Sequence, residues 1–195
     1  MRGPACDVQA LVKTGAVERL GRHDARGFST AGTISDDDRA DVMVLDLKNA
    51  SPHLFESGKA DVRRITTLDG LKDIIHVLDK VYGGHNTWVN ARLGVHLKIP
   101  GYLSVYAAYV DNLPASIAWT YFPHGHFATL FAGSTISEYR RQGLYTSLLS
   151  TRLKEIRERG YQYAVVETGA MSKPIVEKYG FKHLTTVYDY KWHGN

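Results

Sequence analysis

Cysteine is almost absent from the sequence: among 195 residues, Cys6 is the only one. An internal disulfide and a cysteine-rich metal site are therefore excluded, and such usage is typical of a reducing cytoplasm. Long apolar runs are also missing, so no segment is predicted to span a bilayer. The first residues carry no apolar stretch of the kind that a secretory signal needs. We therefore expect a cytoplasmic protein with no membrane partner.

An excess of one charge is missing as well, because 24 Lys and Arg oppose 20 Asp and Glu, for a net charge of +4. The one dense basic cluster is Arg140-Arg141, and further basic residues follow at Arg152, Lys154, Arg157 and Arg159. Acidic residues alternate with this second group, so we interpret it as the solvated face of a helix. No nucleic-acid partner is expected, because the basic charge is mild and no recognition-helix motif is present. The balance favours a small polyanionic ligand.

Two common phosphate-binding motifs are absent, the Walker loop G-x-x-x-x-G-K-[ST] and the dinucleotide fingerprint G-x-G-x-x-G. Instead, the segment STISEYRRQGLYTSLL at 134–149 joins a β-rich apolar run to a run with helical spacing. Between the two runs lie Arg140, Arg141, Gln142 and Gly143. A helix that begins at this glycine leaves its first N–H groups without partners, and an anion satisfies them. The turn is therefore a candidate pyrophosphate site, with a plain strand-to-helix loop as the alternative.

The remaining patterns predict a mixed α/β fold. The expected strands cover residues 42–45, 62–66, 103–110, 115–122, 127–136, 161–166 and 183–192. The expected helices cover residues 68–81, a stretch from 86 to before Pro100, 143–160 and 172–178. The middle strands read as hairpins and the later ones as strand–helix–strand units, which predicts a mixed sheet with helices on both faces. Strand 127–136 should lie parallel to strand 161–166.

Two motifs of this chain resemble those of the GNAT superfamily of N-acyltransferases. The segment EYRRQGLYTSLL is similar to the family's acetyl-CoA-binding pattern [RQ]-x-x-G-x-[GA], with Arg140, Gly143 and Tyr145 on its three positions. Tyr145 departs from the small residue at the third position. Later, SKPIVEKYGF at 172–181 resembles a helix of the family. The resemblance implies a centrally splayed mixed sheet for residues 60–195, whereas residues 1–59 form a poorly defined N-terminal segment. That segment completes the fold, mediates a homodimer or stays flexible.

The resemblance also implies a cosubstrate, acetyl-CoA, and the residues that hold it. The backbone of the strand before the motif, at Ser134, Thr135 and Ile136, would pair with the pantetheine arm. The turn and first helical residues would hold the pyrophosphate: Arg140, Arg141, Gln142, Gly143, Leu144, Tyr145 and Thr146.

In the family, an amine attacks the acetyl thioester directly. Glu167, at the end of a strand, is the candidate general base, with a surface carboxylate as the alternative. Tyr179 is the candidate acid on the later helix, although a structural role competes, and the family's tyrosine position holds Val176 here. Glu138 is expected to pair with the neighbouring arginines.

Other candidate site residues have plain structural explanations. His124 and His126 flank a glycine, and we interpret them as solvated turn residues, so no metal is expected. Trp119 and Tyr121 would line a substrate cleft or pack in the core.

The sequence thus predicts an N-acetyltransferase that moves an acetyl group from acetyl-CoA to a primary amine of a small-molecule or peptide acceptor. The alternative is a GNAT-like module that binds acyl-CoA as a sensor or scaffold without turnover.

Overall fold

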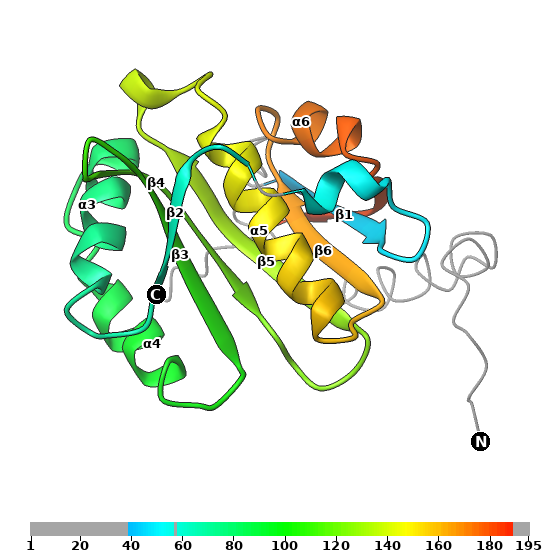
Figure 1. The fold of residues 1–195 in the computed structure, drawn as a ribbon, viewed down its shortest axis with the longest axis horizontal. Coiled ribbons are helices and arrows are strands. Elements are labelled where there is room, and N and C mark those ends of the chain that lie inside the picture. Colours follow the sequence, from blue (N-terminus) through cyan, green and yellow to red (C-terminus); the bar gives the residue numbers. More distant parts are fainter. Residues whose placement is uncertain (1–38, 57, 189–195) are drawn as a thin grey trace, which may run out of the picture.

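The computed structural model describes residues 39–56 and 58–188, which form a mixed sheet with helices on both faces (Figure 1). The strand order is β2-β3-β4-β5-β6-β1-β7, and only β5 and β6 are parallel neighbours. The strands are β1 (Arg39–Asp46), β2 (Asp61–Ile65), β3 (Leu103–Val110), β4 (Leu113–Tyr121), β5 (Phe127–Thr135), β6 (Tyr163–Thr168) and β7 (Lys182–Tyr188). The helices are η2 (Pro52–Phe55), α3 (Leu71–Tyr82), α4 (Trp88–His96), η3 (Ser137–Tyr139), α5 (Leu144–Glu158) and α6 (Lys173–Lys178). The predicted fold class is confirmed.

The central hairpin and the parallel pair follow the prediction. β3 and β4 pair antiparallel around Asp111 and Asn112, whose φ angles of 50° and 62° are tolerated by Asp and Asn in tight turns. β5 and β6 run parallel from Phe127 opposite Tyr163 to Leu130 opposite Val166. The strand that leads into the motif segment therefore lies in the middle of the sheet.

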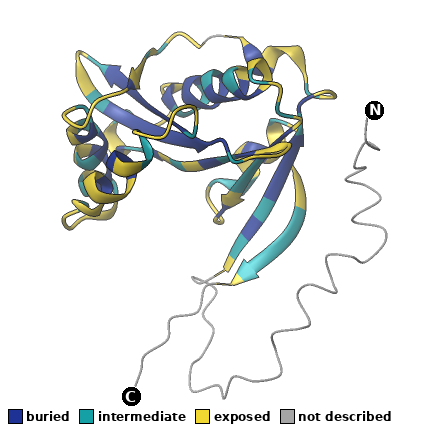
Figure 2. Cartoon of the chain, turned by 90° about the horizontal axis from the view of Figure 1, so that it is seen from below, coloured by how far each residue is buried: buried dark blue, intermediate teal, exposed yellow. Residues whose placement is uncertain are grey.

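Each face of the sheet carries its own core, because successive side chains of a strand point to opposite faces and the central strands are apolar on both. On the α5 face, Ala128, Leu130 and Ala164 pack with Leu149 and Leu153 of the helix. Each large aliphatic side chain buried in this way contributes about 1.5–3 kcal/mol. The buried stripe of α5 lies against the strands (Figure 2).

On the opposite face, which we call the α3/α4 face, Ile117, Trp119 and Tyr121 pack with Ile74 and Val77 of α3. Trp119 and Tyr121 are therefore core residues, with 5% and 9% of their surfaces exposed.

The strand predicted at residues 42–45 is an interior strand of this sheet. β1 pairs antiparallel with β6 on one side and with β7 on the other. Met43 is completely buried and Leu45 is 3% exposed, both in the core beneath α5. The predicted N-terminal segment 1–59 therefore contributes a strand to the sheet, while Cys6 lies outside the described residues. None of the helices in the described ranges combines the length and apolar character needed to cross a bilayer.

Candidate active site

The turn before α5 has the geometry of an anion-binding loop. Arg141 has φ 62° and Gly143 has φ 79°, so two left-handed residues curl the backbone as it enters the helix. Such alternation directs successive N–H groups into one concavity. A Cβ atom placed on Gly143 would meet no protein atom within 4 Å, so the space above this backbone is open. A ligand can therefore approach the main chain closely.

The N–H groups of residues 141–146 have no acceptor among the described residues. The helix has no side-chain cap and no acidic residue in its first turn. Unpaired N–H groups and the positive end of the helix dipole together favour an anion at this position. The turn that the motif identifies thus has unpaired N–H groups at the start of α5, where the prediction places a pyrophosphate.

The side chains of the turn hold the loop in place. Arg140 Nε donates to the carbonyl oxygen of Thr135 at 3.3 Å, and Gln142 Nε2 donates to that of Glu138 at 3.4 Å. Glu138 accepts a hydrogen bond from Ser137 Oγ at 2.6 Å, and the structure contains no ion pair between Glu138 and Arg140 or Arg141. The expected pairing of Glu138 with the arginines is therefore not a direct ion pair, although the Ser137 hydrogen bond and, to a smaller degree, the charge of Arg140 lower the pKa of Glu138. Both arginine side chains are exposed, so their positive charges can interact with an anion at the turn.

The strand leading into this turn separates from its neighbour. The β5–β6 ladder ends at Leu130 opposite Val166, whereas β5 continues to Thr135 along β4 alone. At Ala132 the φ angle is 50°, and the β4–β5 register shifts nearby, which marks a β-bulge. The second half of β5 therefore has a free edge that faces away from β4. A ligand with amide groups can add to this edge as a strand would.

The three residues predicted to pair with pantetheine differ in their availability. Ser134 is buried, its carbonyl accepts from Ser116 Oγ at 2.8 Å, and its hydroxyl bonds to Tyr82 Oη at 3.0 Å. Thr135 bonds Ser116 through its hydroxyl at 2.7 Å. The Ile136 N–H donates to Ala115 O at 3.0 Å, so it is not available to a ligand. The free edge of β5 thus lies before Ile136.

Tyr145, the departure from the family pattern, is accommodated by a glycine that the sequence did not single out. A Cβ atom on Gly133 would lie 2.7 Å from Tyr145 Cε2, so the ring packs directly on the β5 backbone. Burial raises the pKa of Tyr145. The ring thus lies between α5 and the free part of β5.

The two neighbouring residues of the first turn also have defined surroundings. Leu144 is buried in the core with Tyr106, so only its backbone N–H is available to a ligand. Tyr179 Oη lies 3.0 Å from Thr146 Oγ1. The structure therefore places the Tyr179 hydroxyl beside the first turn of α5.

Glu167 lies at the point where β5 and β6 separate. It follows Val166, the last β6 residue paired with β5, and it is opposite Val42 of β1. Val166 packs into the core on the α5 face, so Glu167 points to the α3/α4 face. Its carboxylate is exposed and has no hydrogen bond or ion pair within the described part of the chain. A carboxylate so placed can accept a proton from a ligand at the free edge.

Arg152 was predicted to be solvated, and this prediction is wrong. Its surface is 2% exposed, and its guanidinium donates to the carbonyl oxygens of Leu148, Trp119 and Phe131 at 3.2, 3.5 and 3.4 Å. Burial lowers the pKa of Arg152 to about 10. The signal in the sequence is its position four residues after Leu148 and four before Ile156, within the apolar stripe.

Comparison with solved structures places the fold among known enzymes. The chain matches the aminoglycoside N-acetyltransferase AAC(6')-Iy in complex with CoA at a TM-score of 0.59 and 15% identity, over 71% of this chain and 98% of that one. The aminoglycoside 6'-N-acetyltransferase AAC(6')-Ih from Acinetobacter baumannii gives 0.58 and 14%, over 70% and 99%. A GCN5-related N-acetyltransferase from Kribbella flavida gives 0.56 and 14%, over 88% and 61%.

No family model matches the chain, and a search of curated proteins also gives no match. At these identities the structural matches show the fold alone. The chain therefore has the fold of the GNAT acetyltransferases, as the two motifs predicted.

Proposed function

We propose that this protein is an N-acetyltransferase that uses acetyl-CoA. The observation that carries the proposal is the free edge of β5, followed after the short helix η3 by the unpaired N–H groups of residues 141–146. Pantetheine has amide groups that suit a free strand edge, and its pyrophosphate suits the helix N-terminus. One ligand with both groups in this order is coenzyme A.

In the reaction, the nitrogen lone pair of a neutral amine attacks the thioester carbonyl carbon. A new C–N bond forms, the C–S bond breaks, and CoA leaves as a thiolate. Glu167 accepts the proton that the amine nitrogen loses and passes it to solvent. The thiolate then takes up a proton from Tyr179 or from water. A thiol has a pKa of about 8.5, so the thiolate can leave before it is protonated.

A binding module without turnover is the second candidate. Val176, which occupies the position of the family's tyrosine, is completely buried in the core and cannot reach a ligand. The chain therefore lacks an acid at that position, as a sensor or scaffold would.

Thiol detection separates the two functions. Purified full-length protein is mixed with acetyl-CoA and a panel of amines, and free CoA is followed with a thiol reagent. An acetyltransferase releases CoA at a rate that depends on the amine. Tight acetyl-CoA binding with no amine-dependent release would contradict the enzyme proposal and favour the binding module.

A further inference from the structure

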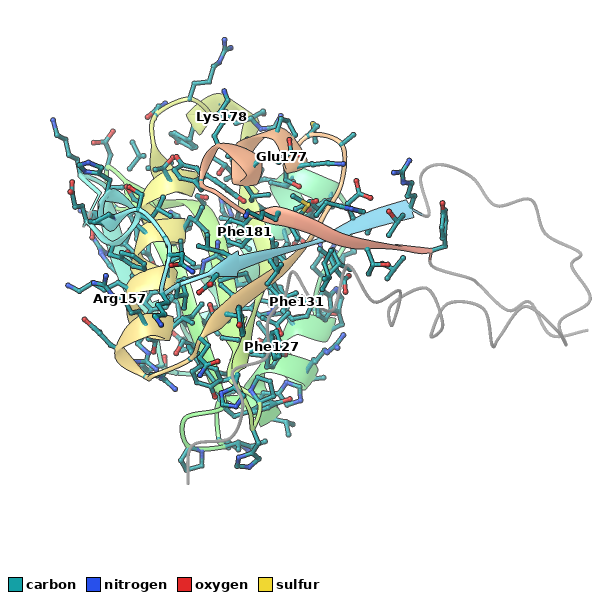
Figure 3. The ribbon with its side chains drawn as sticks, turned by 90° about the vertical axis from the view of Figure 1, so that its right-hand side faces the viewer. Phe127, Phe131, Arg157, Glu177, Lys178 and Phe181 are labelled. Carbon is teal, nitrogen blue, oxygen red and sulfur yellow. The ribbon has the colours of Figure 1, made fainter. Side chains whose placement is uncertain are left out.

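Two phenylalanine rings lie open on the sheet next to the proposed reaction centre. Phe127 and Phe131 of β5 are 38% and 37% exposed, which is unusual for aromatic side chains in the middle of a sheet. They lie on the side of the strands away from α5 and its Arg157 (Figure 3). The Phe127 ring stacks on Tyr163 with ring centres 5.0 Å apart and planes 22° apart. The α3/α4 face therefore presents flat apolar surface along β5.

This surface reaches the point where the strands separate. Phe131 follows Leu130 and Glu167 follows Val166, and Leu130 and Val166 are the last paired residues of β5 and β6. Leu130 and Val166 both pack toward α5, so Phe131 and Glu167 both point to the α3/α4 face. An open aromatic ring and an unpaired carboxylate thus flank the start of the free edge.

The aromatic surface continues toward α4. The Phe131 ring makes an edge-to-face contact with Tyr121, with centres 5.4 Å apart. Tyr121 Oη in turn bonds His96 Nδ1 at 2.8 Å, and burial raises the pKa of Tyr121. This phenol therefore stays neutral and adds no negative charge. We name Phe127, Phe131, Tyr121 and Tyr163 the aromatic face.

The three strands that carry the aromatic face contain little negative charge, and the positive charge of Arg92 in α4 interacts with the Tyr121 hydroxyl. In β4, β5 and β6, which carry this face, Glu167 is the one acidic residue. The described residues also include no group of three or more His, Cys, Asp and Glu side chains arranged as metal ligands are. A ligand with several ammonium groups needs several carboxylates, because each charge taken from water without a partner is costly. Glu167 can compensate only one.

We propose that the acceptor is a monoamine with a flat aromatic body, bound on the aromatic face with its amine toward Glu167. The ring of such an amine gains area burial and an edge-to-face or stacked contact with Phe131. Its single charge, before proton loss, matches the single carboxylate and the nearby ring faces. A polycationic aminoglycoside lacks this match. This inference rests on the acetyltransferase function proposed above.

The test compares three acceptors on full-length protein with saturating acetyl-CoA: 2-phenylethylamine, n-butylamine and kanamycin. We expect kcat/KM for 2-phenylethylamine to exceed that for each of the others by about tenfold or more, from the aromatic contact and buried ring area. Phe131→Ala should lower kcat/KM for 2-phenylethylamine by about tenfold and that for n-butylamine by less than about twofold. Leu113→Ala, at an exposed apolar residue in the β3–β4 hairpin, is the control and should change neither.

The outcomes separate this inference from the function on which it rests. A preference for kanamycin, or equal losses for both simple amines in Phe131→Ala, would overturn the acceptor assignment and leave the acetyltransferase standing. Acetyl-CoA binding with no CoA release for any amine would overturn both. The comparison among acceptors on the wild-type protein decides the matter even if Phe131→Ala fails to fold, which circular dichroism would reveal.

Discussion

Arg152 is a buried cation with three carbonyl oxygens around it and no carboxylate partner within the described residues. Two of these oxygens belong to Trp119 and Phe131, which are opposite each other in the β4–β5 ladder beside the bulge at Ala132. One guanidinium nitrogen, Nη1, donates to both of these oxygens and so bridges the two strands, while Nε donates to the Leu148 carbonyl within the helix. Burying this cation costs free energy. We infer that its hydrogen bonds offset the cost by stabilising the backbone of the bulge.

Arg152→Lys and Arg152→Met distinguish this bridging from simple packing. We expect the Arg152→Lys protein to be about 1–3 kcal/mol less stable than the Arg152→Met protein at pH 7, because it keeps a buried charge while one ammonium replaces the two donating nitrogens, Nε and Nη1. Burial lowers the pKa of a lysine in the folded state, so the folded protein binds fewer protons than the unfolded one. The stability of the Arg152→Lys protein should therefore rise between pH 7 and 10. Urea unfolding at both pH values is the measurement, and a Met variant that is the less stable of the two would contradict the account.

Glu167 is the residue whose chemical role is most easily isolated. Glu167→Gln keeps the size of the side chain and removes its ability to accept a proton. We expect kcat to fall by about 10²–10⁴-fold, as for loss of a general base, while acetyl-CoA affinity stays the same. Glu177→Gln, at an exposed carboxylate on α6, is the matched control. Unchanged kcat in Glu167→Gln would assign proton removal to water or to another residue.

Some features of the candidate site could be predicted from the sequence and others could not. Arg140 and Gly143 belong to a local motif, so the sequence alone identified the turn that they form. Tyr145 and Gly133 meet across α5 and β5, and no local pattern links two residues in separate elements. The positive φ of Ala132 is also invisible in sequence, because alanine rarely adopts it and only the surrounding sheet imposes it.

Among the elements, α6 depends on β1 for its position. Lys173 Nζ of α6 lies 2.8 Å from Asp41 Oδ2, and Thr186 Oγ1 of β7 donates to Asp41 Oδ1 at 2.7 Å. Lys173 and Thr186 hold the pKa of the Asp41 carboxyl well below its usual range. The Asp41 carboxylate thus joins β1, β7 and α6, and α6 is the helix that ends next to Tyr179.

Asp41→Asn should lower the free energy of unfolding by about 1–3 kcal/mol at pH 7, because Lys173 loses its charged partner. The pKa of Asp41 is lower in the folded state than in the unfolded state, where it is near about 3.9. The stabilisation is therefore complete above that value and is lost as pH falls through the lowered pKa. Urea unfolding at pH 7 and pH 3 should show the difference from wild type shrinking at pH 3. Asp111→Asn, in an exposed turn that asparagine tolerates, should have little effect at either pH. An equal deficit for Asp41→Asn at both pH values would exclude the charge as its cause.

The elements themselves were largely predictable. The two apolar runs on either side of the Asp-Asn turn predicted the β3–β4 hairpin, and helical spacing predicted α5, because each pattern lies within one short segment. The ends of the elements differ from the prediction where tertiary packing determines them. Leu68, predicted as the first apolar residue of a helix, is 54% exposed and precedes α3.

At the scale of the whole molecule, the sheet joins strands that are far apart in the sequence, because β1 pairs with β6 and β7. β6 precedes α6 and β7 in the chain, yet β1 lies between β6 and β7. Which strands become neighbours depends on the whole fold, so residues 42–45 could be predicted as a strand but not assigned a partner. We propose that the folded domain includes β1 from Arg39 on and so extends to the N-terminal side of residue 60.

Met43→Ala tests that boundary. Met43 is completely buried beneath α5, so we expect a loss of about 2–5 kcal/mol in one cooperative transition of the whole domain. Met171→Ala, at a methionine that is 80% exposed, should change stability by less than about 0.5 kcal/mol. Thermal and urea unfolding would show a separate N-terminal unit if Met43→Ala left the main transition in place.

The central claim is that the turn before α5 holds the pyrophosphate of coenzyme A, and titration calorimetry with acetyl-CoA tests it most directly. Gly143→Asp adds a negative charge beside the anion, and Gly143→Asn adds a side chain of the same shape without charge. Both residues tolerate the left-handed conformation of Gly143, so strain is similar in the two variants. Each charge-assisted phosphate hydrogen bond contributes about 1.5–3 kcal/mol, so Gly143→Asp should weaken binding by about tenfold to several hundredfold. Gly143→Asn should bind between that value and wild type, with both variants shown to be folded. If folded Gly143→Asp protein binds acetyl-CoA as tightly as wild type, Gly143 is only a turn residue and the cofactor site is not at the start of α5.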